Sequence, residues 1–350
     1  MDVDELARWL VETAGPVIRF RTLLEILHEQ DLGIVSDALR DLHASPIVQK
    51  WLGRLQPNLG FHQIHSSSPI AFENVMGKLV QLGLHAGLQP FDSLTLPFRV
   101  WLSERMKEKA PERVGPWEGF SELLLAGFLA YAGYSDTSPV KTMTLERLRK
   151  AHWFAENVSF DSFYVTATKR EWLVDPQFYR EVEYGLPFVH DIRGFAGSPW
   201  ILNHTEYRKK AEQIISTILS PEYQNLKEGY GYMKRGDRFY SIGWSVHLPN
   251  YLEPAKENEM SKLLLSLELL APFETARKST WFNESLKLLE EQRVREGQYR
   301  FPRTWLPEKP SGYWAGGHYM ALEDDRRKQA SIDYESTFRV IKIKHLAGLI

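Results

Sequence analysis

The sequence predicts an all-α protein built from stacked helical hairpins, with glycine- and aromatic-rich loops and little or no strand. Three observations predict this fold class. Apolar residues recur at helical spacing along most of the chain, Ser-Pro pairs precede many of these segments, and a Gln–Gly–aromatic order recurs at three helix ends. Strand signals are few, since only FDSFYVTA at 160–167 and RFYSIGWSV at 238–246 suggest strands. We expect one domain over 1–350.

Amphipathic helices account for most of the periodic segments. In PIAFENVMGKLVQLGL the three-four spacing produces one apolar stripe: Phe72, Val75, Met76, Leu79 and Leu82. SIDYESTFRVIKIKHLAG has a similar stripe of Tyr334, Phe338, Ile341 and His345. Further helices are predicted over 17–29, 119–131, 140–155, 205–219, 259–271 and 280–291. Ser-Pro pairs stand at 45–46, 68–69, 138–139, 198–199 and 220–221. Serine caps free amides and proline suits the first helical position, so most of these pairs predict helix starts.

One order of residue types, helix then glutamine then glycine then aromatic, occurs three times. Its copies are Gln56 with Gly60-Phe61, Gln224 with Gly229-Tyr230, and Gln292 with Gly297 and Tyr299. A glycine at a helix end takes the left-handed conformation that closes the helix. The glutamine can then hydrogen-bond backbone across the turn. Hairpins repeated in this way must stack to bury their apolar faces. The alternative is a chance recurrence in a chain rich in these residues.

The first copy, Trp51-Leu52-x3-Gln56-x3-Gly60-Phe61, resembles the QW repeat of squalene and oxidosqualene cyclases. Phe61 replaces the final Trp of that repeat, and the last copy has Lys287 where an aromatic residue is usual. WLVETAGPVIRFRTLLEIL at 9–27 is similar to the opening of bacterial prenyltransferase/squalene-oxidase-repeat proteins. This resemblance implies a terpenoid cyclase-like α/α toroid, a ring of helical hairpins whose inner helices line a cavity for isoprenoid chains or peptides.

The catalytic signatures of that superfamily are incomplete in this chain. The stretch 322–325, Leu-Glu-Asp-Asp, has the last two aspartates of the Asp-x-Asp-Asp acid and lacks the first. Arg-Arg-Lys follows, so the magnesium motif Asp-Asp-x-x-Asp lacks its third carboxylate. Zinc-dependent prenyltransferases and thioester proteins need a cysteine, and the chain has none. Asp324 and Asp325 are therefore weak catalytic candidates, and we expect a solvated charge run here.

Composition excludes several classes of function. The net charge of −2 gives no basic excess that would attract nucleic acid. No window reaches about 18 consecutive apolar residues, so we expect no membrane span. An acidic N-terminus and the lack of cysteine indicate a cytoplasmic protein. His62 and His65 are spaced for a shared metal but have no obvious third ligand, so we predict no metal and no cofactor.

The candidate ligand-binding residues lie in two glycine- and aromatic-rich stretches, 229–249 and 311–328. They are Tyr232, Tyr240, Trp244, His247, Tyr313, Trp314 and His318. His247 is also a weak catalytic candidate, because imidazole can shuttle a proton near neutral pH. The alternative is that both stretches pack as a hairpin plug and a surface excursion.

The sequence favours a protein that binds an isoprenoid-like, apolar or amphipathic ligand in an aromatic-lined cavity. It leaves catalysis undecided. Two alternatives stay open. The incomplete signatures favour a non-catalytic scaffold for a protein or peptide partner, and aromatic platforms also suit a carbohydrate-active α/α barrel. The last alternative needs paired carboxylates that face the cavity.

Overall fold

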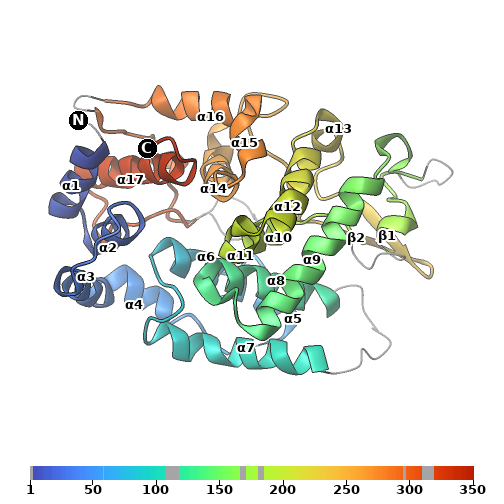
Figure 1. Cartoon of the computed structure of the whole chain (residues 1–350), viewed down its shortest axis with the longest axis horizontal. Coiled ribbons are helices and arrows are strands. Elements are labelled where there is room, and N and C mark those ends of the chain that lie inside the picture. The colour runs from blue at the N-terminus through green and yellow to red at the C-terminus, as the bar shows by residue number, and fades with distance from the viewer. Residues whose placement is uncertain are drawn as a thin grey trace. The chain divides into compact units, whose positions relative to one another are not determined.

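The computed structural model describes residues 3–57, 59–107, 118–165, 171–179, 185–294, 297–309 and 319–350. Helices make up most of these residues, and the only sheet among them has two strands (Figure 1). The prediction of a mostly helical protein is thereby confirmed. Within the same ranges, no helix combines the length and the apolar character needed to cross a membrane.

The chain folds into two compact units. Unit 1 comprises Met1–Pro57, Ser66–Leu94 and Pro254–Ile350, and unit 2 comprises Asn58–His65 and Thr95–Glu253. Both units are assembled from separate stretches of the sequence, and α7 (Phe91–Lys107) begins in unit 1 and continues in unit 2. The expectation of one domain over 1–350 stays a prediction.

Unit 1 is organised around its last helix, α17 (Gln329–Leu346). Figure 1 shows α17 beside α1, α2 and α14, and each of these helices packs against it. All residues of α17 from Ser331 to Ile343 are buried except the half-buried Tyr334, so nearly the whole surface of the helix is covered. The other helices of the unit are α1 (Val3–Thr13), α2 (Pro16–Glu25), α3 (Leu32–Ala44), α4 (Pro46–Leu52), α6 (Phe72–Gln81), α14 (Met260–Leu270), α15 (Glu274–Lys278) and α16 (Thr280–Glu290).

The core of unit 1 contains charged side chains as well as apolar ones. Lys342 on α17 pairs with Glu25 at 3.0 Å and with Glu268 at 2.7 Å. Burial raises the pKa of the Glu25 carboxyl, but the charges of Arg21 and Lys342 outweigh it and lower that pKa to about 2. The pKa of Glu268 is lowered to about 2 in the same way, chiefly by Lys342. Charge pairing therefore makes the buried carboxylate of Glu268 and the half-buried carboxylate of Glu25 tolerable.

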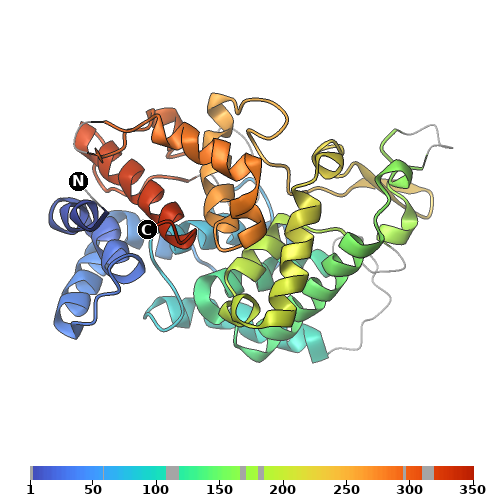
Figure 2. The same cartoon turned by 45° about the horizontal axis from the view of Figure 1, so that its top comes forward.

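Unit 2 is a layered packing of helices. Its helices are α5 (Phe61–Ile64), α8 (Glu118–Leu129), α9 (Ser138–Asn157), α10 (Val189–Ala196), α11 (Pro199–Asn203), α12 (Thr205–Ile218) and α13 (Pro221–Gln224). Figure 2 shows the yellow α12 against the green α9, and α8 packs on both α9 and α10. A Cβ atom on Gly127 of α8 would lie 2.5 Å from the His190 carbonyl oxygen of α10. Glycine at this position therefore permits the close approach of the two helices.

Four of the five Ser-Pro pairs stand at a helix start. The Ser220 hydroxyl accepts a hydrogen bond from the Tyr223 amide at 3.2 Å and so caps α13 as predicted. Ser45 and Ser198 precede α4 and α11 but form no side-chain cap, and Ser138 is the first residue of α9. The pair at 68–69 lies in a turn ahead of α6 and is the one pair that does not start a helix.

The two predicted strand segments have different outcomes. RFYSIGWSV forms the short strand β2 (Arg238–Ser241), which pairs antiparallel with β1 (Tyr232–Arg235) and then turns away. FDSFYVTA instead begins with a 3-10 turn over Phe160–Ser162, followed by a single bridge between Tyr164 and Val174. Over the described part of that segment, residues 160–165, the short partial alternation does not produce a regular strand.

Candidate functional site

Two glycine-aromatic turns of unit 2, residues 229–231 and 242–244, lie side by side in a strained conformation. The Gly243 amide donates to the Gly229 carbonyl at 2.8 Å, and the Ile242 amide donates to the Gly231 carbonyl at 3.0 Å. Tyr230 and Trp244 both have positive φ, at 62° and 56°. Such values are outliers for bulky side chains and cost about 1–3 kcal/mol each. The surrounding structure must therefore hold both residues in place.

Tyr230 is held in place by hydrogen bonds to a second buried tyrosine, Tyr223, and to the backbone. Its hydroxyl donates to the Pro187 carbonyl, while the Tyr223 hydroxyl lies 2.6 Å from it. Tyr223 in turn accepts from the Val246 amide at 3.1 Å. With Tyr230 donating to Pro187, Tyr223 supplies the proton between the two hydroxyls. Burial raises the pKa of both phenols, so both stay protonated and the hydrogen-bond chain persists at neutral pH.

The predicted role of the repeated glutamine is met by Gln224. This buried side chain donates to the carbonyls of Ile218 and Val246 at 2.8 and 3.0 Å, and it accepts from the Leu248 amide at 2.9 Å. It thus joins the end of α12 to the segment after Trp244. Gln56 differs, because it is exposed and, within the described part of the chain, donates to the Gly53 carbonyl of its own turn alone. The bonding role that we predicted for Gln56 is therefore wrong.

His247 and Ser245 form a second clamp on the strained turns. The Nε2 atom of His247 donates to the Leu226 carbonyl at 2.8 Å, so Nδ1 accepts from the Ser245 hydroxyl at 2.7 Å in the neutral tautomer. The Ser245 oxygen also accepts from the Gly229 amide at 2.7 Å. Serine beside histidine is the pairing of a nucleophile and a base. Here Ser245 is buried and its oxygen is engaged by Gly229, so the geometry favours a structural role.

Trp244 lies against four other rings from three parts of unit 2. Its centroid lies 4.7 Å from those of His65 and Phe120, 6.0 Å from His190 and 6.2 Å from Phe188. We call Trp244, His65, Phe120, Phe188 and His190 the Trp244 wall. Phe120, Phe188 and His190 are buried, whereas Trp244 and His65 are only half-buried. The wall therefore combines a fixed aromatic base with an accessible edge.

The other predicted ligand-binding residues have separate locations. Tyr232 and Tyr240 belong to the β-hairpin, where Tyr232 pairs with Ser241 and Tyr240 pairs with Met233. Tyr313, Trp314 and His318 lie outside the described residues. Convergence of all seven residues on one cavity stays a prediction. Phe120 and Phe188 were missed because their sequence segments predict ordinary helices and turns.

The acidic run 323–325 lies in unit 1, and its three carboxylates have different partners. The carboxylate of Asp324 accepts from the Ile47 amide at 2.8 Å and from the Ser45 hydroxyl at 2.9 Å, so it caps the start of α4. Asp325 pairs at 2.8 Å with the exposed Arg327. The hydrogen bonds from Arg327 lower the pKa of the Asp325 carboxyl. The solvated charge run that we predicted is thus present at Asp325, whereas Asp324 is a structural cap.

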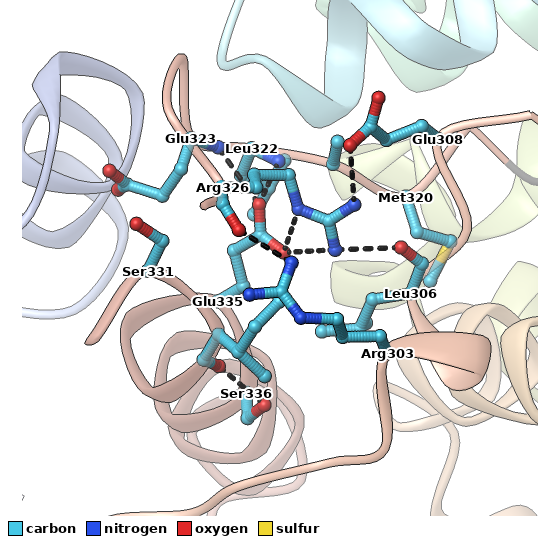
Figure 3. Close-up of polar contacts among 12 residues, drawn as sticks. Arg303, Leu306, Glu308, Met320, Leu322, Glu323, Arg326, Ser331, Glu335 and Ser336 are labelled. Carbon is cyan, nitrogen blue, oxygen red and sulfur yellow. Dashed lines mark hydrogen bonds and ion pairs between the residues drawn. The ribbon is translucent and has the colours of Figure 1, made fainter. Parts of the chain in front are cut away.

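A buried carboxylate, Glu335 of α17, organises the chain around this run. Figure 3 shows that Glu335 accepts hydrogen bonds from the backbone amides of Leu322 and Glu323, at 2.7 and 2.9 Å, and pairs with Arg326. Arg326 also donates to the Leu306 carbonyl at 2.7 Å. Glu335 is fully buried. A buried carboxylate of the central helix thus binds two backbone amides and one arginine of the extended segment around 322–326.

Basic side chains bind the backbone of residues 319–321, immediately before this segment. Lys78 of α6 donates to the backbone carbonyls of Tyr319 and Ala321. Arg339 of α17 donates to the Met320 carbonyl at 2.6 Å. Burial, followed by the charge of Arg339, holds the pKa of Lys78 well below its usual range. Among the described residues, no group of three or more histidine, cysteine or acidic side chains is arranged to hold a metal.

The carboxyl of Glu323 has a raised pKa. Its Oε1 accepts from the Gly15 amide at 2.9 Å, at the start of α2, and its side chain points away from Glu335 (Figure 3). Burial raises its pKa to about 7, and the negative charges of Glu335 and Asp324 act in the same direction. The folded chain therefore binds a proton at Glu323 more tightly than the unfolded chain.

The Glu323→Gln variant is expected to gain stability relative to the wild type as the pH rises. Wild-type stability falls as the pH rises from about 4.5, the usual pKa of this carboxyl, to about 7, its pKa in the folded chain. In this range Glu323 loses its proton in the unfolded chain but keeps it in the folded chain. Glutamine keeps the acceptor for Gly15 and does not titrate. The gain in unfolding free energy should be about 2–3 kcal/mol larger at pH 8 than at pH 5, measured by urea denaturation. Asp325→Asn serves as the exposed control and should show no such pH dependence. An equal gain at both pH values would contradict the assignment.

No protein-family model matches the sequence, and comparisons with curated proteins and with solved structures find no match either. The resemblance to prenyltransferase/squalene-oxidase-repeat proteins accordingly stays a prediction.

Proposed function

We propose that the chain binds an apolar or amphipathic small molecule against the Trp244 wall. The observation that carries this proposal is the half-buried Trp244, held at positive φ and packed on four rings. Bulky residues keep such a conformation only where the fold over-determines it, and these positions concentrate at ligand clamps and active sites. A pre-positioned indole offers a large apolar surface without an ordering cost on binding.

The chemistry of the wall suits an amphipathic ligand. Phe120 and Phe188 support the apolar face of the indole, while His65 lies at the half-buried edge. An imidazole can donate or accept a hydrogen bond, so His65 can orient a hydroxyl or another polar head group. An isoprenoid alcohol combines these two features, an unsaturated apolar chain and one polar end. We therefore place an isoprenoid-like compound first among the ligand classes.

The α/α toroid and the relationship to terpenoid cyclase-like proteins belong to the same proposal. The bonding of Gln224 supports them, because this side chain ties successive turns together as the repeat requires. In such a toroid, the inner helices would surround the ligand and exclude water from its chain. The proposal concerns binding, and catalysis stays undecided.

Loss of a bound ligand in Trp244→Ala is the expected result that tests this function. Organic extracts of the purified wild type and variant are compared by mass spectrometry, and farnesol is titrated into both proteins after extraction. We expect an isoprenoid or lipid in the wild-type extract alone. Farnesol affinity should fall on the order of tenfold in the variant, because one well-packed aromatic anchor is removed.

Trp172→Ala is the matched control in the same unit. Trp172 also has positive φ, at 61°, but it is 43% exposed and packs on Tyr164, outside the Trp244 wall. Its extract and farnesol affinity should equal those of the wild type. An empty wild-type extract together with no farnesol binding would contradict the proposal, and peptide and sugar ligands would be tested next. Equal losses in both variants would show that the effect is not specific to the wall.

A further inference from the structure

Two histidines from opposite ends of the sequence meet at the surface of unit 1. His28 follows the end of α2, and His345 lies in the last turn of α17. Their ring centroids are 5.1 Å apart and the ring planes are inclined by 51°. His28 is exposed and His345 is half-buried. The packing of α2 against α17 thus presents two adjacent imidazoles to solvent.

The backbone fixes His28 in this position. The residue has φ of 49°, in the left-handed region, where a helix end usually has glycine or asparagine. The Leu27 amide donates to the Thr22 carbonyl at 3.0 Å, and the Glu29 amide donates to the Leu23 carbonyl at 2.9 Å. These bonds close the end of α2 on both sides of His28. The imidazole therefore extends from an anchored turn.

The separation of the rings agrees with shared coordination of one ion. Zinc binds imidazole nitrogen at about 2.0–2.1 Å, and two imidazoles at the tetrahedral angle have their ring centroids about 5 Å apart. Within the described residues, neither ring forms a hydrogen bond to protein, so coordination would displace no existing contact. The carboxylate of Glu25 affects His345 electrostatically but is already bound by Arg21 and Lys342.

We propose that His28 and His345 form a two-histidine site for a divalent transition-metal ion such as Zn²⁺ or Cu²⁺. Imidazole ligands suit these ions, whereas Mg²⁺ and Ca²⁺ prefer oxygen. Two protein ligands leave the other coordination positions to water or to a small exogenous ligand. The site differs from the sequence prediction of no metal, because the two ligands are far apart in the chain and belong to no local motif. It does not depend on the function proposed for Trp244.

Copper binding to the untagged full chain tests the site. We expect one Cu²⁺ per chain by calorimetry, with an electron paramagnetic resonance signal of two equatorial imidazole nitrogens. His28→Gln and His345→Gln should each weaken binding on the order of 100-fold, because the second imidazole no longer binds intramolecularly. His85→Gln, which removes an exposed histidine of the same unit, should have no effect.

The spectrum of the wild-type protein provides a readout that does not depend on any variant. A signal from one nitrogen or none would overturn the proposal. Equal copper affinity in the wild type and in the double variant His28→Gln, His345→Gln would overturn it as well, because the ion would then bind elsewhere.

Discussion

Glu335→Ala is expected to lower the free energy of unfolding by about 3–5 kcal/mol, because it leaves the buried Arg326 without its carboxylate. Glu335 is fully buried and also accepts from the amides of Leu322 and Glu323. The substitution therefore removes acceptors from two backbone donors as well as from a cation. Urea denaturation followed by circular dichroism measures the change.

Glu308→Ala is the matched control for this prediction, since Glu308 pairs with the same arginine. Its side chain is 67% exposed and lies 3.4 Å from Arg326. Exposed ion pairs contribute about 0–1 kcal/mol, so this variant should remain close to the wild type. Glu335→Gln keeps one acceptor oxygen and should have an intermediate stability. Equal losses in Glu335→Ala and Glu308→Ala would show that Glu335 does not organise the segment around 322–326.

Each segment that helical periodicity predicted contains a helix, but α1, α3 and α7 were not predicted, and periodicity did not show which faces the helices bury. The segment 331–348 was predicted from one apolar stripe, and the structure has α17 over Gln329–Leu346. The buried residues of α17 include the charged Glu335, Arg339 and Lys342, which a sequence pattern assigns to a solvated face. These side chains are buried because their partners come from α2, α14 and the segment after 318. Such pairings depend on tertiary packing, which local periodicity does not determine.

The candidate site was predictable only in part, because its neighbouring side chains also come from segments far apart in the sequence. Glycine beside aromatic residues identified 229–249, because positive φ has a clear residue signal. The structure places strained residues there, including Trp244. His65 and Phe120 were not identified as its neighbours, because each belongs to a distant segment. Asp324 likewise caps α4 across most of the chain length. Short-range patterns therefore identified strained turns but not the side chains that pack against them.

Asp191→Ala is the second prediction with a large expected effect, and it concerns unit 2. Arg147 of α9 binds both oxygens of Asp191 at 2.8 Å, and Asp191 also accepts from the Phe188 amide at 2.8 Å. The two side chains are 6% and 1% exposed. Removing the carboxylate takes the Asp191 counter-charge away from the buried Arg147 guanidinium and uncaps α10, so the unfolding free energy should fall by about 3–5 kcal/mol. Hydrogen exchange of the α10 amides reports this change locally.

The double variant Arg147→Met, Asp191→Ala distinguishes loss of the ion pair from loss of packing. Methionine removes the uncompensated charge and retains an unbranched apolar side chain, so the double variant should be more stable than Asp191→Ala alone. Asp136→Ala is the exposed control. The Asp136 side chain is 77% exposed and pairs with Lys141 of α9, the helix that also contains Arg147. Its effect should stay within about 1 kcal/mol. If the double variant were no more stable than Asp191→Ala, the destabilisation would come from the lost cap of α10. The position of the Trp244 wall would then depend on that cap, since Phe188 and His190 flank the start of α10.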